Sequence, residues 1–232
     1  KPNVKFKEVI KKISTDDIVK DSTCDFDPTS TVTLAERILQ PTELQVNLQL
    51  CKKDFHSDWE AAAMGYSAFD NLPPKFSDFL LGHVSAKVAQ KTEQTIWAGA
   101  AATAGEFGGF TELLTADGDV TDVAAVGGGV TSANVIAQLG AIVDAVPSTL
   151  YTNEDLHIYV SQNIAKAYVR ALGGFSTNVG AAGINNEGTQ WSSNGSMTFD
   201  GIKLFVANGL AANTAVAAEK SNLFFGTGLM SD

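Results

Sequence analysis

The sequence predicts a protein of the α+β class, in which strand and helix segments follow one another without regular alternation. Three observations support this class. Residues 31–51 have the alternating pattern of strands, residues 76–98 have the pattern of one long helix, and residues 130–218 contain two helix patterns among short strand patterns. The chain has 232 residues, of which 44% are hydrophobic. We therefore expect one large domain, or two closely packed domains, with a substantial core.

The charge of the chain is distributed unevenly. The formal net charge is −10, yet the first twenty residues carry six lysines and only three acidic residues. From residue 101 onward, four basic residues stand against twelve acidic ones. Nucleic-acid binding requires clustered Lys and Arg side chains that displace counterions from phosphates, and this larger part of the chain lacks them. We therefore expect no sequence-specific nucleic-acid binding.

The sequence also bears on the compartment of the protein. No apolar run reaches the ~20 residues of a membrane-spanning helix, and no signal peptide opens the chain. Cys24 and Cys51 have neither paired spacing nor a neighbouring His, which favours free thiols in a reducing cytoplasm over a disulfide or metal site. We expect a soluble protein of cytoplasmic origin without a membrane partner. Because the chain begins at Lys1 and not at Met, we also expect a processed product or a fragment.

The N-terminal segment gives an ambiguous pattern. In residues 1–21, the apolar residues from Phe6 to Ile13 have helical spacing, whereas Val4 and Phe6 alternate as in an extended arm. Both alternatives remain open. Residues 21–30 contain several Asp residues and a Pro, so we expect a turn-rich connection.

Residues 31–51 are predicted to form a ribbon of strands. Val32 and Leu34 alternate before Pro41, and four apolar residues from Leu44 onward alternate strictly with Gln and Asn after it. This pattern predicts two long antiparallel strands, or one strand after a kink, with one polar face. A two-stranded ribbon is barely stable alone in water, so we expect its apolar face to rest on another surface, such as another copy of the chain.

Residues 76–98 are predicted to form a single long helix. Pro73 and Pro74 precede it, Ser77 is suited to cap its start, and Gly99 follows its last apolar residue. At ~1.5 Å per residue, the helix is about 35 Å long. A narrow apolar stripe runs along it, which indicates a helix that supports other parts of the protein. The stripe contains Phe76, Leu80, Val84, Val88 and Ile96, with Phe79 and Trp97 beside it.

The composition changes after this helix. Residues 100–129 are rich in Gly, Ala and Asp, which predicts a long ordered loop without a core of its own. From Val130 onward, the pattern is that of a compact unit of helix, strand and helix. The first helix is predicted to be capped by Thr131 or Ser132 and stopped by Pro147. Its inward face is expected to contain Val135, Ile136, Leu139, Ile142, Val143 and Val146.

The rest of this unit combines a second helix with short strands. A strand is predicted over residues 156–160, after which Ser161 caps a helix that ends at Gly173 and Gly174. The inward face of this helix is expected to contain Ile164, Ala165, Tyr168, Val169 and Leu172. Polar residues and glycines predict an exposed excursion over residues 175–196. Three further strands are predicted at 202–206, after the turn pair Asp200-Gly201, and at 216–218 and 222–225.

No complete catalytic or ion-binding motif is present. A nucleophile elbow needs Gly-x-Ser-x-Gly, and residues 65–69 lack the closing glycine, so Ser67 is a weak candidate nucleophile. The triple glycine 127–129 could imitate a phosphate-binding loop, but no Lys follows it and we expect a turn. A calcium loop is the third candidate, but no Glu closes it at the required distance, which favours a solvated turn. Its alternating carboxylates would be Asp117, Asp119 and Asp122.

The histidines do not suggest a metal site. His56, His83 and His157 occur in no paired ligand pattern, and His83 is expected to be a packed or exposed structural residue on the long helix. Asn194 begins a glycosylation sequon, which has meaning only in a secreted chain. We expect no catalytic residue, no cofactor and no metal ion, and we interpret the surface of the protein as its functional part.

The order of these segments resembles that of the major capsid protein of tailed bacteriophages with the HK97 fold, which encapsulin shells also use. The resemblance covers most of the chain and is carried by TLAERILQPTELQVNLQLCKKDF, by the helix ending in TIWAG and continuing to EFGGFTELL, by IVDAVPSTLYTNEDLHIYVSQNIAKAYVRAL, and by GIKLFVANGLAANTAVAAEKSNLFFGTGL. It implies a fold with an extended loop, a peripheral domain that carries a long spine helix, and an axial domain of helices around a small sheet.

The resemblance also implies a division of the chain. The parts, in order, are an N-terminal segment (1–21), the extended loop (22–55), the peripheral domain (56–129) with its spine helix (76–98), the axial domain (130–215) and strands that return to the peripheral domain (216–232). Family members usually have a longer N-terminal arm and further chain at the end, so we expect this chain to be truncated. Some members crosslink a loop Lys to an Asn, but no motif supports this role for Lys52 or Lys53.

The function implied by the resemblance is structural, not enzymatic. We expect a protein that assembles with copies of itself, as pentamers and hexamers, into the icosahedral shell around a phage genome, with scaffold, portal or decoration proteins as further partners. It would be part of the virion after assembly in the host cytoplasm. Two alternatives stay open: an encapsulin-like compartment, and a hydrolase or sugar-binding enzyme with a loop-lined cleft. For the enzyme, the first residues to test would be Glu106, Asp117 and Asp119.

Overall fold

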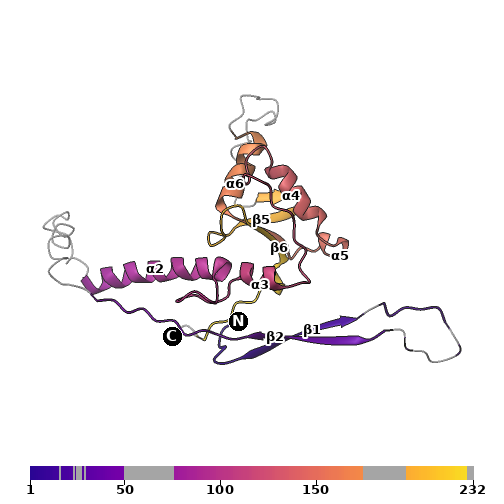
Figure 1. Ribbon diagram of the computed structural model, residues 1–232, viewed down its shortest axis with the longest axis horizontal. Helices are drawn as coiled ribbons and strands as arrows, with labels where there is room; N and C mark the ends of the chain where they lie inside the picture. Colours follow the sequence, from indigo (N-terminus) through magenta and orange to yellow (C-terminus); the bar gives the residue numbers. More distant parts are fainter. Residues whose placement is uncertain are drawn as a thin grey trace. The chain divides into compact units, whose positions relative to one another are not determined.

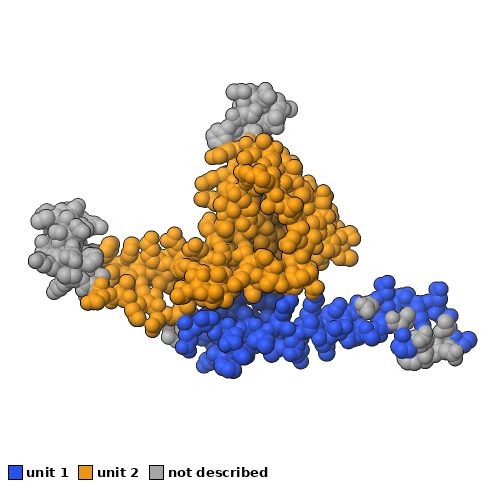
Figure 2. All heavy atoms as spheres, in the orientation of Figure 1, with its two compact units in different colours: residues 1–43, 224–232 blue, residues 44–223 orange. Residues whose placement is uncertain are grey.

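The protein is described from a computed structural model. The structure describes residues 1–15, 17–22, 24, 28, 30–49, 76–174 and 197–228. In this part of the chain the fold is mixed, with two sheets and five α-helices, which agrees with the predicted α+β class. The chain forms two compact units, Lys1–Glu43 with Phe224–Asp232, and Leu44–Leu223 (Figure 2). None of the described helices is long and apolar enough to cross a membrane.

The first unit is a two-stranded antiparallel ribbon. Strand β1 (Glu8–Thr15) pairs with β2 (Val32–Leu39), with Glu8 opposite Leu39 at one end of the ladder and Thr15 opposite Val32 at the other (Figure 1). The N-terminal segment, for which helix and extended arm were both open, therefore contains a strand. Alternate positions of β1 supply apolar side chains opposite those of β2, and this cross-strand pairing favours the extended form.

The predicted strand after Pro41 is not formed. Residues 44–49 have no strand structure, and β2 takes β1 as its partner instead. Strand β2 ends at Leu39, shortly before Pro41, which has no amide hydrogen for a ladder bond. An alternating pattern shows that a segment can be a strand but does not select its partner, so the prediction was wrong for residues 44–49.

The base of the ribbon joins two distant parts of the chain. The Val4 amide donates to the Thr227 carbonyl (3.1 Å), and the Thr227 amide donates to the Lys1 carbonyl (3.0 Å). Val4 is buried at this junction. Gly226 lies against Leu39, where an added Cβ would be 2.8 Å from a methyl carbon of that side chain. Residues 224–228 thus belong to the first unit. The strand expected at 222–225 is not formed, so this prediction was wrong.

The second unit contains a four-stranded sheet in the order β4-β5-β3-β6. Strand β3 (Leu156–Val160) is parallel to β5 (Ile202–Val206) and antiparallel to β6 (Ala215–Glu219), and β4 (Met197–Phe199) forms a hairpin with β5. The hairpin turn is Asp200-Gly201, both with positive φ (46° and 82°), as a two-residue turn with the twist of the strands requires. Strand β4 was missed by the sequence analysis because it is only three residues long.

Helices α4 (Val135–Asp144) and α6 (Gln162–Val169) pack on one face of this sheet (Figure 1). The main core contains Val135, Leu139 and Val143 of α4, Leu156, Ile158 and Val160 of β3, and Ile164 and Tyr168 of α6. The predicted helix–strand–helix unit is therefore confirmed, with two corrections. Ile136 is 49% exposed because it lies beyond the inward face of α4. Leu172 is also exposed, in the π-helical extension Arg170–Gly174.

The start of α4 differs from the prediction. The helix begins after Asn134, and not at Thr131 or Ser132. The Asn134 side-chain oxygen accepts from the Thr131 amide (2.7 Å), so the three residues before the helix form a turn of their own. Asn and Thr are both suitable capping residues, and local sequence does not choose between them. The helix ends before Pro147 as predicted, and a short helix α5 (Ser148–Tyr151) follows.

The long helix is confirmed as α2 (Phe76–Ala98), and its C-terminal end packs against the sheet. Trp97 is buried in a second cluster with Ala207 and Leu210, and its ring centroid lies 5.0 Å from that of Tyr159 on the second face of the sheet. Gly209 packs on the helix backbone, where a Cβ would be 2.1 Å from the Glu93 carbonyl oxygen.

The predicted apolar stripe of α2 is not buried along most of the helix. Among the described side chains of α2, only Thr95 and Trp97 are buried, whereas Val88 of the stripe is 42% exposed and Phe79 beside it is 59% exposed. The loop after α2 is also less uniform than predicted, since it contains helix α3 (Phe110–Ala116). Phe110 packs against Trp97 (5.3 Å between ring centroids), which gives this short helix an anchor.

Candidate functional site: an exposed apolar face of the ribbon

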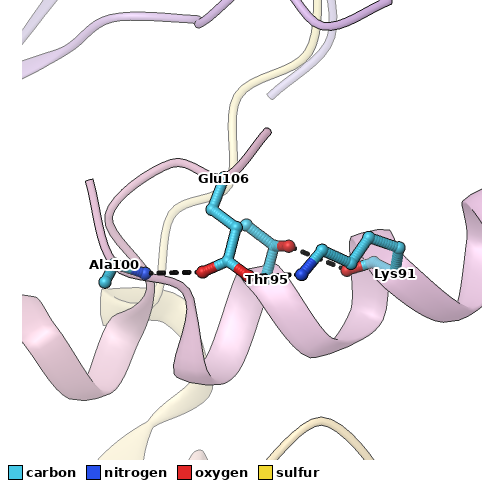
Figure 3. Close-up of polar contacts among 4 residues, drawn as sticks. All are labelled: Lys91, Thr95, Ala100 and Glu106. Atoms are coloured by element: carbon cyan, nitrogen blue, oxygen red, sulfur yellow. Dashed lines mark hydrogen bonds and ion pairs between the residues drawn. The ribbon is translucent and has the colours of Figure 1, made fainter. Parts of the chain in front are cut away.

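Glu106, the first candidate for an acid–base role, has a structural environment. One carboxylate oxygen accepts from the Ala100 amide (3.1 Å) and the other forms an ion pair with Lys91 (Figure 3). The Lys91 hydrogen bond and the Ala100 amide lower the pKa of Glu106 below its ordinary value. Glu106 therefore ties the loop after α2 back to the end of that helix.

The connection between α2 and α3 depends on two glycines. Gly99 and Gly109 approach each other closely, with the Gly109 amide donating to the Gly99 carbonyl (2.9 Å). A Cβ on Gly109 would lie 2.6 Å from the Gly99 nitrogen, so only glycine fits. Glu112 adds a second carboxylate that accepts from the Ala101 amide (2.9 Å). These contacts hold α2 and α3 together and leave no free acid–base pair at this position.

The carboxylates of the enzyme alternative, Glu106, Asp117 and Asp119, do not line one shared pocket. Asp117 is the C-cap residue that follows α3. Its side chain accepts a hydrogen bond from the Asp119 amide (3.2 Å), as in a local turn. Asp119 and Asp122 line a groove in the second unit that includes neither Asp117 nor Glu106. Among the described residues, no group of three or more His, Cys, Asp or Glu side chains is arranged to hold a metal ion.

The triple glycine forms a turn, as expected. Gly128 and Gly129 have positive φ (83° and 85°), and the Gly129 amide donates to Val126. The next amide, that of Val130, donates to the Asn213 side chain (2.8 Å). Asn213 therefore uses its side chain to fix this turn.

The remaining candidates fall into two groups. His83 is exposed on α2, and His157 is buried with its Nδ1 2.6 Å from the Asp155 carbonyl and its ring next to Phe205, so both have structural surroundings. Cys24 is an exposed free thiol. The other group lies outside the described residues and contains His56, Cys51, Lys52, Lys53, Ser67 and Asn194.

The most unusual surface of the described residues is one face of the ribbon. Residues that are paired across an antiparallel ladder share a face, so Val9 with Ile38, Ile13 with Leu34, and Val32 opposite Thr15 lie on the same side. We call this set the apolar ribbon face, and it contains Val9, Ile13, Val32, Leu34 and Ile38. Each is between 46% and 67% exposed. The Lys11–Glu36 pair lies in the middle of the same face.

The opposite face of the ribbon is much more polar. Its cross-strand pairs are Glu8 with Leu39, Ile10 with Arg37, Lys12 with Ala35, and Ser14 with Thr33. The ribbon is therefore amphipathic, and its apolar face is exposed. Monomeric proteins rarely expose several large apolar side chains on one face, and such a face usually marks an interaction surface.

Sequence reasoning found part of this face. It identified Val32 and Leu34 and expected the apolar side to rest on another surface. It missed Val9 and Ile13, because two adjacent lysines, Lys11 and Lys12, interrupt the pattern of β1. The available signal was the apolar–Lys–apolar alternation at residues 9, 11 and 13.

Comparison with known proteins does not assign the chain to a group. No protein-family model matches the sequence, and no curated protein matches it significantly.

Proposed function

We propose that this protein is a shell subunit, the major capsid protein of a tailed-phage head of the HK97 type, and that it functions by assembling with copies of itself. The exposed apolar ribbon face is the observation that carries this proposal. A two-stranded ribbon with five exposed large apolar side chains gains stability when a neighbouring subunit covers it. A closed shell provides such a neighbour for every subunit through repeated equivalent contacts.

Other features agree with this proposal. Strand β2, the long helix and the helix–sheet unit follow one another along the chain in the order of extended loop, spine helix and axial domain, whereas β1 lies in the segment expected to precede the loop. The exposed part of α2, including Leu81 and Val88, offers a second surface for neighbouring subunits. The acidic balance from residue 101 onward suits a container that must not bind its nucleic acid tightly. In this proposal the partners are other copies in pentamers and hexamers, and the protein resides in the virion.

The proposal is tested by measuring the assembly state of the purified chain. Light scattering and electron microscopy are expected to show rings or shells for the wild type. Ile13→Asp combined with Leu34→Asp introduces two charges into the apolar ribbon face and is expected to leave monomers. The matched control is Ser14→Asp with Thr33→Asp, because this neighbouring pair lies on the opposite face of the same ribbon.

The two results that would reject the proposal are clear. Wild-type protein that remains monomeric under all assembly conditions contradicts it directly. Assembly that is lost equally in the Ser14/Thr33 control would show that the apolar ribbon face has no special role. Circular dichroism of each variant checks that the four-stranded sheet is still folded.

A further inference from the structure

The outer edge of the four-stranded sheet has open hydrogen-bonding groups. Strand β6 is at the end of the sheet order, and within the described part of the chain it pairs only with β3. The Ser161 amide donates to the Thr214 carbonyl and the Lys220 amide donates to the Asp155 carbonyl, so residues 214, 216, 218 and 220 direct their backbone groups toward β3. The backbone groups of Ala215, Ala217 and Glu219 therefore point away from the sheet, and they have no backbone hydrogen bond to any described residue.

A groove runs along this edge within the second unit. Its volume is about 560 Å³, which is within the usual range of ligand pockets. Val120 and Val123 of the loop after α3 line it, together with Ile142 of α4 and Val146, which follows that helix. The side chains of β6 in the groove are small, since three of its five residues are Ala. The walls of the groove thus combine apolar side chains with polar ones, and small side chains on its β6 side leave room beside the backbone.

The charge of the groove has one sign. Asp119, Asp122 and Glu219 line it, and none of the described Lys or Arg side chains does. The Glu219 carboxylate also accepts from the Asn153 side chain (2.5 Å), which holds it at the end of β6. An occupant with a positive side chain would therefore be favoured over a neutral or acidic one.

We propose that this groove binds an extended peptide segment that adds as a further strand to β6. The segment carries small apolar side chains for the walls and at least one Lys or Arg for the carboxylates. Strand addition gives affinity through backbone hydrogen bonds to Ala215, Ala217 and Glu219, and the side chains give specificity. This inference concerns a different surface from the apolar ribbon face and does not depend on the proposed shell function.

A peptide-binding measurement on the full chain tests this proposal. The probe is a fluorescein-labelled Ala-Val-Lys-Val-Ala-Lys peptide, followed by anisotropy at low protein concentration, where light scattering shows the chain unassembled. Two control peptides replace the second Val by Pro, which removes one amide donor, or both Lys by Glu. We expect saturable binding of the first peptide and at least about tenfold weaker binding of both controls, since one lost hydrogen bond or reversed charge has about this effect.

Variants of the chain locate the site. Ala217→Pro removes an outward amide from an edge position where Pro is compatible with the sheet, and we expect it to weaken binding about tenfold. Asp122→Asn lies in the opposite wall and is expected to weaken binding severalfold, which keeps the test valid if Ala217→Pro does not fold. Asp144→Asn is the matched control, because Asp144 is an exposed carboxylate that does not line the groove, and we expect unchanged binding.

Three outcomes would overturn the proposal. The first is no rise in the anisotropy of the labelled peptide, kept at a fixed low concentration, as the protein is titrated up to the highest concentration at which light scattering shows it unassembled. The second is equal binding of the proline peptide, or equal binding by both Ala217→Pro and Asp122→Asn. The third is that these two variants change the oligomeric state but not peptide binding. This result would mean that a second copy of the chain, and not a peptide, occupies the groove. Failure of shell assembly in the ribbon experiment would leave the peptide result unaffected, so the two proposals can fail separately.

Discussion

Apolar and polar residues alternate in strands of both units, but the apolar side chains are exposed in the ribbon of the first unit and buried in the sheet of the second. In the sheet, Ile158 of β3 has no exposed surface, because α4 and α6 cover its face. In the ribbon, Leu34 of β2 is 63% exposed, although it is paired with another apolar residue across the ladder. The comparison shows that hydrogen-bonded pairing defines a strand, whereas burial of one face provides its stability.

Among the substitutions that test this comparison, we expect the largest loss of stability in the sheet. Ile158→Ala removes a fully buried side chain from the centre of the main core, and we expect it to lower the free energy of unfolding by about 2–5 kcal/mol. Chemical denaturation followed by circular dichroism measures this change. A loss below ~0.5 kcal/mol, the range of surface substitutions, would show that the sheet is not the stable part of the chain.

The next effect concerns the contact between the sheet and the long helix. Gly209→Ala adds a Cβ that would lie 2.1 Å from the Glu93 carbonyl oxygen, so the loop after β5 must move away from α2. We expect a loss of about 1–3 kcal/mol in the free energy of unfolding, as for other overpacked positions. Gly118→Ala is the control, because an added Cβ at Gly118 contacts nothing within 4 Å. Equal melting temperatures for both variants would contradict the close contact.

A smaller and pH-dependent effect is expected at Glu106. Its pKa in the folded protein lies below the ordinary value of 4.5, so its ion pair and hydrogen bond stabilise the fold above that pH and this stabilisation is lost as the pH falls through the lowered pKa. Wild type should therefore melt at a higher temperature than Glu106→Gln at pH 7, and the difference should shrink below pH 4.5. The control is Glu154→Gln, at an exposed carboxylate for which the described residues provide no hydrogen-bond donor. A difference that is constant with pH would refute the role of this ionisation.

The smallest effect is expected in the ribbon of the unassembled chain. Leu34→Ala removes an exposed side chain and should change the free energy of unfolding by no more than ~0.5 kcal/mol. The matched variant is Leu204→Ala in β5, where the same substitution removes a buried side chain and should cost about 2–5 kcal/mol. Denaturation of both variants under conditions that prevent assembly gives the comparison. Similar losses would mean that the ribbon is covered within a single chain.

Elements with their own local signals could be predicted from the sequence. Helix α2 has prolines before it and a glycine after it, and the two helices around β3 have regular apolar spacing, although the start of α4 was predicted too early. Tertiary pairings could not be predicted in the same way. Nothing in the local sequence of Val32–Leu39 distinguishes β1 from residues 44–49 as its partner, because both carry alternating apolar residues and the choice depends on how the chain folds back.

The candidate surface was predictable only in part, and for the same reason. Exposure of an apolar residue is a property of the folded protein, so Leu34 and Leu204 look alike in the sequence. Glu106 shows the opposite case. A carboxylate in a Gly-rich segment fitted an acid–base role, but its use as an acceptor for the Ala100 amide depends on a turn that brings together residues six positions apart. Nothing in the local sequence indicates that position 209 requires glycine. The backbone that leaves no room for a Cβ there belongs to α2, more than a hundred residues earlier.

The hydrogen bonds between Thr227 and residues 1–4 have a consequence for synthesis on the ribosome. Translation delivers the two halves of this junction far apart in time, since at ~5–20 residues per second the interval is on the order of tens of seconds. The whole of the second unit emerges during this interval. We therefore expect the base of the ribbon to stay open in a nascent chain until Thr227 has been synthesised, after the residues of the second unit.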